Sequence, residues 1–111
     1  MQFSKEMMKG TAEVIVLQAL NSSDAYGYEL ITRIAETSDN VFEFQEGTLY
    51  PLLYRLEDRG YVKSYKAQAP RGKVRRYYAL TKDGSTFLKS RTQEFKAFIA
   101  GMQQALHLMH V

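Results

Sequence analysis

Two strand-like segments joined by a turn interrupt a chain that otherwise has the pattern of helices. Residues 61–67 and 74–80 have the pattern of strands, and Pro70-Arg71-Gly72-Lys73 between them is a turn. The apolar spacing elsewhere predicts helices over residues 5–20, 25–36, about 46–59 and 82–108. Three compact helices followed by a hairpin form the winged helix-turn-helix arrangement, in which the third helix enters the DNA major groove and the hairpin flanks it. The expected fold class is therefore mainly α with a small β-hairpin, followed by a long C-terminal helix.

Local signals predict where these helices begin and end. Asp24, after an Asn-Ser-Ser turn cluster, is expected to cap the second helix, and residues 41–44 alternate briefly as a short extended segment. Pro51 falls in the first turn of the third helix, where its missing N–H costs little, and Gly60 ends that helix. Leucines at positions 49, 52, 53 and 56 form its buried stripe, which leaves the other faces of the third helix free.

The last helix has apolar residues at heptad spacing and is long for so small a domain. The stripe consists of Leu88, Phe95, Met102 and Met109, with Phe98, Ile99 and Leu106 beside it. This helix would measure about 40 Å against a core about 26 Å wide, which favours a partner helix over packing on its own domain. We therefore expect a DNA-binding domain at residues 1–81 and a dimerisation helix at residues 82–111. In the first helix, residues 14–17 are apolar on all sides, which suits a central core helix, a helix partly covered by a second subunit, or both.

Basic charge is concentrated around the hairpin. Between Arg55 and Arg76 there are eight Lys or Arg and two acidic residues, a net charge of +6 where the whole chain carries +3. Such a local excess is typical of a protein that binds a polyanion, although it also suits a solvated basic face. The predicted winged helix favours the polyanion, and double-stranded DNA is the expected partner.

Several function classes are excluded by what the sequence lacks. A chain of 111 residues has the size of one domain, and it contains no cysteine and only two histidines, His107 and His110. It has no metal-ligand cluster, Gly-rich phosphate loop or Ser/His/Asp arrangement, so we expect no enzyme, metal site or cofactor. The N-terminus lacks the apolar stretch of a signal peptide and no apolar run is long enough to cross a membrane, which makes the cytoplasm the expected location.

Three segments of the chain carry specific motifs: YGYEL at residues 26–30, EGTLYPLLYRLEDRGYV at 46–62 and RRYYALTKDG at 75–84. Together they resemble the PadR family of bacterial transcriptional regulators over residues 1 to about 85. The single helix after the hairpin is similar to the smaller PadR-like subgroup. The resemblance implies a homodimeric winged-helix protein, usually a repressor, that binds an inverted repeat in a promoter. It also implies a dimer formed by the first and last helices, and in many members release by a small aromatic or hydrophobic effector.

The third helix carries the first set of expected DNA contacts. Hydroxyl groups of Thr48, Tyr50 and Tyr54 can bond phosphates or base edges, unless the two tyrosines pack against the hairpin. Gly47 allows the DNA backbone to approach the N-terminus of the helix, unless it is only a loop glycine. Arg55 is expected to contact a phosphate or to pair with a neighbouring carboxylate.

The hairpin carries the second set. Arg71 and Lys73 at its tip are candidates for phosphate or minor-groove contacts. Because successive strand residues point to opposite faces, only one of Arg75 and Arg76 can face DNA, and Arg75 is assigned to it. Further candidates for the DNA backbone are Tyr28, which core packing would also explain, and Lys5 and Lys9, which solvation would also explain.

Apolar residues of the first and last helices are assigned to an effector and to the dimer. An effector pocket would be lined by Met7, Val14, Phe95 and Ile99, which would serve equally as plain dimer core. The dimer interface is expected to use Leu88, Phe95, Phe98, Met102 and Leu106. The alternative function is a winged-helix adaptor that binds another protein instead of nucleic acid.

Overall fold

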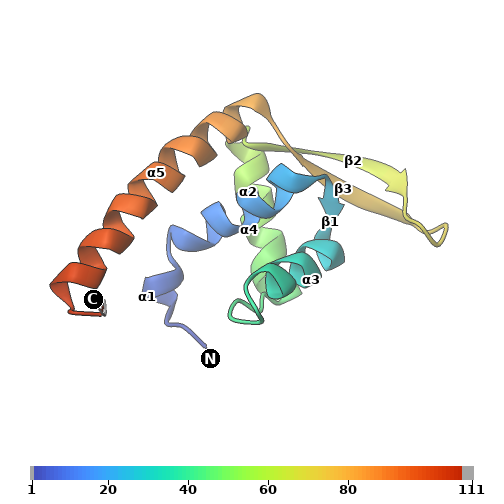
Figure 1. The fold of residues 1–111 in the computed structure, drawn as a ribbon. Coiled ribbons are helices and arrows are strands. Elements are labelled where there is room, and N and C mark those ends of the chain that lie inside the picture. The colour runs from blue at the N-terminus through green and yellow to red at the C-terminus, as the bar shows by residue number, and fades with distance from the viewer. Residues whose placement is uncertain (1, 109–111) are drawn as a thin grey trace.

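The computed structural model of the chain describes residues 2–108, and the predicted order of helices and hairpin is confirmed. The described residues form five helices and three strands (Figure 1). The elements are α1 (Lys5–Met8), α2 (Thr11–Ser22), β1 (Ala25–Tyr26), α3 (Gly27–Thr37), α4 (Glu46–Asp58), β2 (Val62–Gln68), β3 (Val74–Leu80) and α5 (Lys82–Ala105).

Helices α2, α3 and α4 surround one hydrophobic core, which the sheet and the first part of α5 complete. The leucine stripe predicted for α4 is confirmed: because its members are spaced three and four residues apart they share one face, and all are at most 3% exposed. The rest of the core consists of Val16, Leu17 and Leu20 of α2, Leu30 and Ile34 of α3, Ala25, Val62 and Tyr78 of the sheet, Leu88 of α5 and Phe44.

The sheet is antiparallel with the order β1-β3-β2, so the predicted hairpin has a third, short strand at its side. Ala25 and Tyr26 pair with Tyr78 and Tyr77 of β3, and α3 begins only at Gly27. The prediction that Asp24 caps a helix starting at residue 25 is therefore wrong. A two-residue strand has no periodicity of its own, and it exists because the edge of β3 offers it partners.

The first predicted helix is interrupted at Gly10, so a single helix over residues 5–20 is also wrong. Gly10 has φ +80°, a left-handed conformation that glycine adopts at little cost and that ends the helical hydrogen bonding. The Ser4 hydroxyl caps the single turn of α1 by accepting from the Met7 N–H at 3.2 Å. The Thr11 hydroxyl, at the start of α2, donates to the Met7 carbonyl at 2.9 Å.

Residues 41–44 form no strand, contrary to the expected extended segment. They belong to the connection between α3 and α4, where no neighbouring strand is available to them. Their alternation reflects burial instead: Phe44 is 8% exposed, and Phe42 packs against the core with its ring 5.5 Å from that of Phe3.

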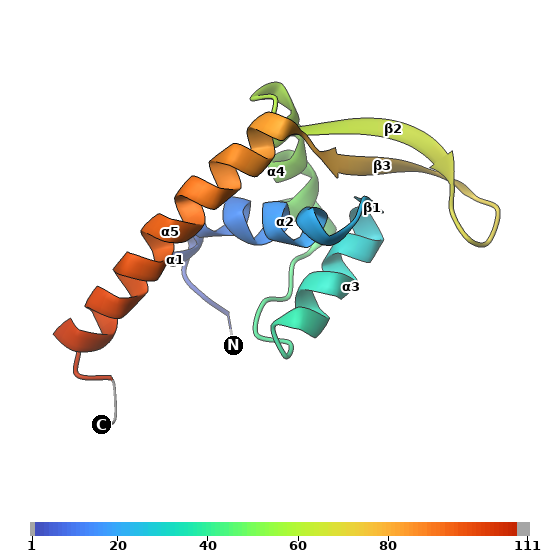
Figure 2. The same cartoon turned by 45° about the horizontal axis from the view of Figure 1, so that its top comes forward.

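Helix α5 starts against the body of the molecule and then extends away from it, as two views show (Figures 1 and 2). The Thr81 hydroxyl caps its first turn by accepting from the Gly84 N–H at 3.0 Å. Leu88, predicted for the dimer interface, is 4% exposed and packs in the core of its own chain, so it has almost no surface left for a partner. The helix ends at Ala105 rather than residue 108, and the predicted stripe residue Met109, like His110, lies outside the described residues.

Two glycines of α5 allow a matched test of this packing. A Cβ on Gly84 would overlap the Tyr61 carbonyl oxygen and lie 2.9 Å from Leu80 Cδ1, whereas a Cβ on Gly101 would meet nothing within 4 Å. We expect Gly84→Ala to lower the free energy of unfolding by about 1–3 kcal/mol through overpacking. Gly101→Ala should raise it by about 0.5–1 kcal/mol through helix propensity.

Urea unfolding of both variants and the parent, followed by circular dichroism at one protein concentration, measures these changes. Equal effects of the two substitutions would contradict the close approach of α5 to Tyr61.

Candidate nucleic-acid interface

The outward face of α4 holds most of the residues predicted to contact DNA on this helix. Because the leucine stripe faces the core, Gly47, Thr48, Tyr54 and Arg55 are all exposed. A Cβ on Gly47 would meet no atom within 4 Å, so the packing of the fold does not require a glycine there. The first turn of α4 is thus an open helix N-terminus, a surface whose N–H groups suit a phosphate.

Tyr50 lies between this open face and the junction of α3 with α4. Its ring covers Gly27, where a Cβ would come within 2.6 Å of the Tyr50 Cζ. Burial, and then the Glu46 carboxylate, raise the pKa of the Tyr50 hydroxyl, which therefore stays protonated at neutral pH. The ring of Tyr54, 54% exposed, lies 6.3 Å from that of Tyr50. Tyr50 therefore packs against the start of α3, and Tyr54 stands beside it on the open side.

The hairpin of β2 and β3, which we call the wing, projects away from the helices (Figure 1). Its tip is closed by hydrogen bonds from the Ala69 N–H to the Lys73 carbonyl at 2.7 Å and from the Gly72 N–H to the Ala69 carbonyl at 2.8 Å. Gly72 has φ +86°, so the tight turn depends on a glycine. Arg71 and Lys73 are exposed at this tip, and neither forms an ion pair with any described residue.

The strand register separates Arg75 and Arg76 onto opposite faces of the wing, as the alternation predicted. Arg76 shares a face with buried Tyr78 and donates to the Ser64 hydroxyl at 3.1 Å; that hydroxyl donates to the Glu57 carboxylate of α4 at 2.6 Å. Arg75 lies on the other face, with its guanidinium 5.3 Å from the ring centre of Tyr26.

On this register, Arg76 shares one face of the wing with its cross-strand partner Lys66, and both are exposed. Arg75 was among the DNA contacts predicted from the sequence and stays a predicted contact, whereas neither Lys66 nor Arg76 was. The signal that identifies them is the buried Tyr78, which sets the inward face of β3, but its burial is known only from the structure.

Stacked tyrosines stiffen the face of the wing that carries Arg75. The rings of Tyr65 and Tyr77 lie 5.7 Å apart and nearly parallel, and Tyr26 meets Tyr77 edge-on at 5.4 Å. The Tyr65 hydroxyl donates to the Asp24 carboxylate at 2.5 Å. One tyrosine from each strand thus ties the wing to the loop before β1, and cross-strand aromatic pairs of this kind stabilise a hairpin.

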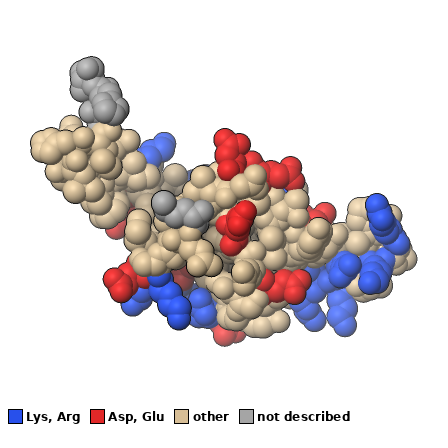
Figure 3. Space-filling view, turned by 90° about the horizontal axis from the view of Figure 1, so that it is seen from below, with Lys and Arg blue, Asp and Glu red and all other residues tan. Residues whose placement is uncertain are grey.

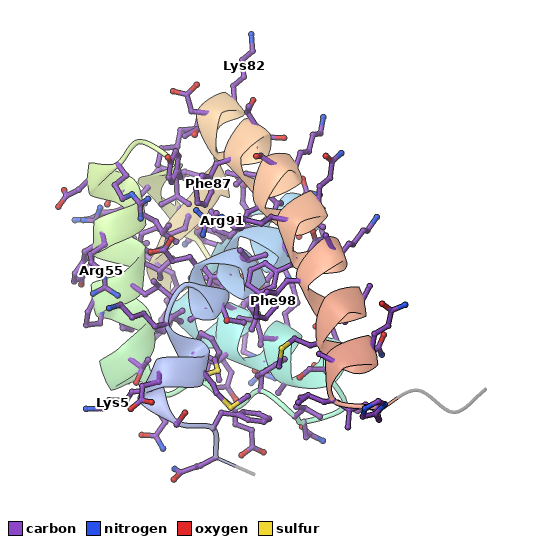
Figure 4. The ribbon with its side chains drawn as sticks, turned by 90° about the vertical axis from the view of Figure 1, so that its left-hand side faces the viewer. Lys5, Arg55, Lys82, Phe87, Arg91 and Phe98 are labelled. Carbon is purple, nitrogen blue, oxygen red and sulfur yellow. The ribbon has the colours of Figure 1, made fainter. Side chains whose placement is uncertain are left out.

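Two lysines stand in α1 and just after it, with Glu6 between them. Lys5 and Arg55 extend from α1 and α4 on the same side of the molecule (Figure 4), and Lys5 and Lys9 are both exposed. Seen from below, most Lys and Arg side chains follow one edge of the molecule and the wing, while many Asp and Glu side chains stand elsewhere (Figure 3). Tyr28, in the first turn of α3, is 64% exposed, so it is free of the core packing that was its alternative explanation.

A mostly apolar hollow of about 570 Å³ lies between α2, α3 and α5. Of the four residues predicted to line an effector pocket only Val14 lines it, while Met7, Phe95 and Ile99 do not. Arg33 lies at the hollow with its guanidinium held by the carbonyls of Ala19 and Ser23, both at 2.8 Å. The other lining residues are Ile15, Gln18, Ala19, Ser22, Ile34, Thr37, Ser38, Phe42 and Thr92.

The second half of α5 carries an uncovered apolar stripe. Phe98 is 62% exposed, Met102 41% and Leu106 54%, and Ile99 beside them is also exposed, whereas Phe95 is half-buried. Large apolar side chains exposed in a continuous row are typical of a surface that another protein covers.

Two further findings bear on what the chain does. Within residues 2–108, no helix is both long and apolar enough to cross a membrane. The same part of the chain has no group of three or more histidine, cysteine or acidic side chains placed to hold a metal ion.

Comparison with known proteins agrees with this geometry. A transcriptional regulator from Clostridium thermocellum has a solved structure that is 30% identical to this chain with a TM-score of 0.81, covering 93% of this chain and 97% of its own. A PadR-like transcriptional regulator from Bacillus cereus is 26% identical with a TM-score of 0.81, covering 92% and 97%. A PadR family transcription regulator from Clostridium difficile is 33% identical with a TM-score of 0.74, covering 85% and 96%.

The family model of the transcriptional regulator PadR-like family matches residues 16–90, which include α3, α4, the wing and the start of α5. Members of this family are transcriptional regulators and not enzymes, in agreement with the expectation from the sequence. The matched segment covers more than half of the chain, so this protein belongs to the PadR-like family of transcriptional regulators.

Proposed function

We propose that this regulator is a cytoplasmic repressor that binds an inverted-repeat operator in double-stranded DNA as a homodimer. The observation that carries the proposal is the combination of an open, hydroxyl-bearing face on α4 with an exposed basic tip on the wing. In a winged helix, the former suits the major groove and the latter the adjacent phosphates or minor groove.

Each group of residues has a distinct role in this proposal. Thr48, Tyr50 and Tyr54 read base edges or bond phosphates from α4, and Arg55 bonds a phosphate. Arg71 and Lys73 hold the sugar-phosphate backbone without reading sequence. The weaker backbone candidates are Gly47, Tyr28, Lys5, Lys9, Lys66, Arg75 and Arg76.

The uncovered stripe of α5 supports the homodimer. Phe98, Ile99, Met102 and Leu106 together present an apolar surface that the same stripe of a second copy matches in chemistry, and a two-fold interface uses the same patch twice. Phe95, half-buried on the same helix, completes the interface. Dimerisation would bring two copies of α4 to half-sites about 34 Å apart, one turn of DNA.

The hollow between α2, α3 and α5 supports an effector of small aromatic or hydrophobic type. Its volume and its largely apolar lining suit such a compound. A ligand there would contact α2 and α5 together, and Met7, Phe95 and Ile99 would join Val14 at the site only where the dimer closes over it.

The rival function is a winged-helix adaptor for another protein. The basic wing tip favours DNA over a protein partner, since two exposed cations at a tight turn suit phosphates. Shift assays at low salt with the DNA upstream of the gene distinguish the two, because an adaptor would bind a protein and leave that DNA unshifted.

The wing tip should contribute sequence-independent affinity. Changing Arg71 and Lys73 to alanine should weaken binding to operator and random DNA alike. The slope of log K against log salt should flatten by about 0.9 for each phosphate that the tip no longer neutralises, because fewer counterions are released.

Fluorescence anisotropy titrations at several salt concentrations measure both quantities. Lys89→Ala with Lys96→Ala is the charge-matched control, since both lysines are exposed on α5. A wing variant that keeps the slope of the parent would show that the tip does not touch phosphate.

The outward face of α4 should instead contribute discrimination between operator and random DNA. Thr48→Val removes a hydroxyl and keeps the shape of the side chain, so operator affinity should fall by about 1–3 kcal/mol while binding to random DNA changes little. Titration of both DNAs at one salt concentration gives the ratio. A parallel loss on both DNAs would assign Thr48 to the phosphate backbone instead of the bases.

The α5 stripe should hold the dimer. Phe98→Ser with Met102→Ser should give monomers in sedimentation equilibrium and a large loss of operator affinity, because one half-site binds weakly. Gln93→Ser with Gln104→Ser changes two positions elsewhere on the same helix and should leave the dimer intact. A monomeric parent, or a dimeric stripe variant, would refute the proposed interface.

A further inference from the structure

A cluster of stacked side chains joins the end of α4 to the start of α5. It consists of Arg59, Tyr61, Phe87 and Arg91, and we call it the clasp. The rings of Tyr61 and Phe87 stack at 4.4 Å with an angle of 16°. The Arg59 guanidinium lies 5.1 Å from the Tyr61 ring centre and 5.7 Å from that of Phe87, and the Arg91 guanidinium lies 4.7 Å from Phe87.

Backbone contacts hold the same two helix ends together. The Thr81 hydroxyl donates to the Gly60 carbonyl at 2.6 Å, and the Thr81 N–H donates to the Tyr61 carbonyl at 3.1 Å. Arg59 also binds α2, with its Nη1 at 3.1 and 3.2 Å from the two carboxylate oxygens of Glu13. Figure 4 shows Phe87 and Arg91 pointing from α5 into the space between α5 and α4. The clasp therefore connects the DNA-facing helix, the central helix and the helix with the apolar stripe.

The charged part of the clasp lies partly at the surface, since the Arg59 side chain is 46% exposed and that of Arg91 33%, while Leu88 anchors α5 in the core. The Glu13 carboxylate that pairs with Arg59 is 19% exposed, so a test at position 59 must keep the positive charge. The clasp also restricts the angle at which α5 leaves the body, because its flat side chains are stacked on one another.

That angle matters because α5 acts as a lever. Over its 24 residues the helix is about 36 Å long, so a tilt of about 5° moves its far end by about 3 Å. A displacement of this size is close to the step of about 3.4 Å between base pairs along one DNA strand. In a dimer joined through α5, the same tilt in both subunits would therefore change the separation of the two α4 helices by up to about 6 Å, or one to two base pairs.

We propose that Phe87 and Arg59 are positioning residues that set the half-site spacing of the operator by holding α5 at a fixed angle to α4. The proposal rests on the proposed function, since it requires a DNA-binding dimer joined through α5. Neither residue touches DNA in this proposal, so both act only through the geometry of the dimer.

The test measures spacing selectivity. An operator is first selected from random duplex DNA with the full-length parent, and variants of it are made with the half-sites one base pair closer and one base pair farther apart. The parent should lose about tenfold or more in affinity at either altered spacing, a loss comparable to that from one mismatched base pair. Phe87→Leu, which removes the ring, should reduce this loss to about threefold or less while binding to an isolated half-site stays as in the parent.

Two further substitutions keep the test decisive. Phe87→Tyr keeps the stacked ring and should retain the spacing preference of the parent. Arg59→Lys keeps the charge but loses the flat guanidinium. The variant should fold, because the Arg59 side chain is half-exposed. It should also show a broader spacing preference than the parent. Lys89→Gln, elsewhere on α5, is the control and should change neither quantity.

The possible failures are distinguishable. A parent that selects no DNA sequence overturns the proposed function and the role of the clasp with it. A parent that selects an operator, together with Phe87→Leu and Arg59→Lys variants that keep its spacing preference, overturns the role of the clasp alone. Loss of half-site binding in these variants would also overturn it, because the effect would then arise inside one subunit.

Discussion

Burial of the leucine stripe of α4 decides which surface of the molecule is left to face a partner. Four leucines on one helix face are at most 3% exposed, and they pack against residues from α2, α3, the sheet and α5. A helix that buries one face this completely has no rotational freedom, so Thr48, Tyr54 and Arg55 must point outward. The open face of α4 is thus a consequence of core packing and requires no further interaction to orient it.

The burial of one residue in β3 determines which face of the wing points toward the core. Tyr78 in the middle of this strand is fully buried, and burial of one residue in a strand fixes the face of every other residue along it. Hydrogen bonds that run from Arg76 through Ser64 to Glu57 connect the same face to α4. On the opposite face, Tyr77 stacks on Tyr65 and meets Tyr26 edge-on, so aromatic contacts run across all three strands. The basic tip is therefore carried on a wing that is held by contacts on both of its faces.

Helix α5 serves two purposes along its length. Its first part completes the core through Leu88 and is held at Tyr61 by a close backbone contact that only glycine at position 84 allows. Its second part leaves the body with Phe98, Met102 and Leu106 exposed. A helix anchored at one end and uncovered at the other transmits any change of angle at the anchor to its free end, and the clasp lies at that anchor.

The element order, the inward stripe of α4 and the hairpin with its basic tip could all be predicted from the sequence, because they follow from local periodicity and turn chemistry. Its motifs are also specific enough to indicate the family without knowledge of the fold. Features that depend on contacts distant in sequence could be known only from the folded chain: the pairing of Ala25 and Tyr26 with β3, the placement of Leu88 in the core, and the hydrogen bonds that link Arg76 through Ser64 to α4. The break at Gly10 belongs with them, since a glycine inside an apolar helical pattern is compatible with both a continuous and an interrupted helix until packing selects one.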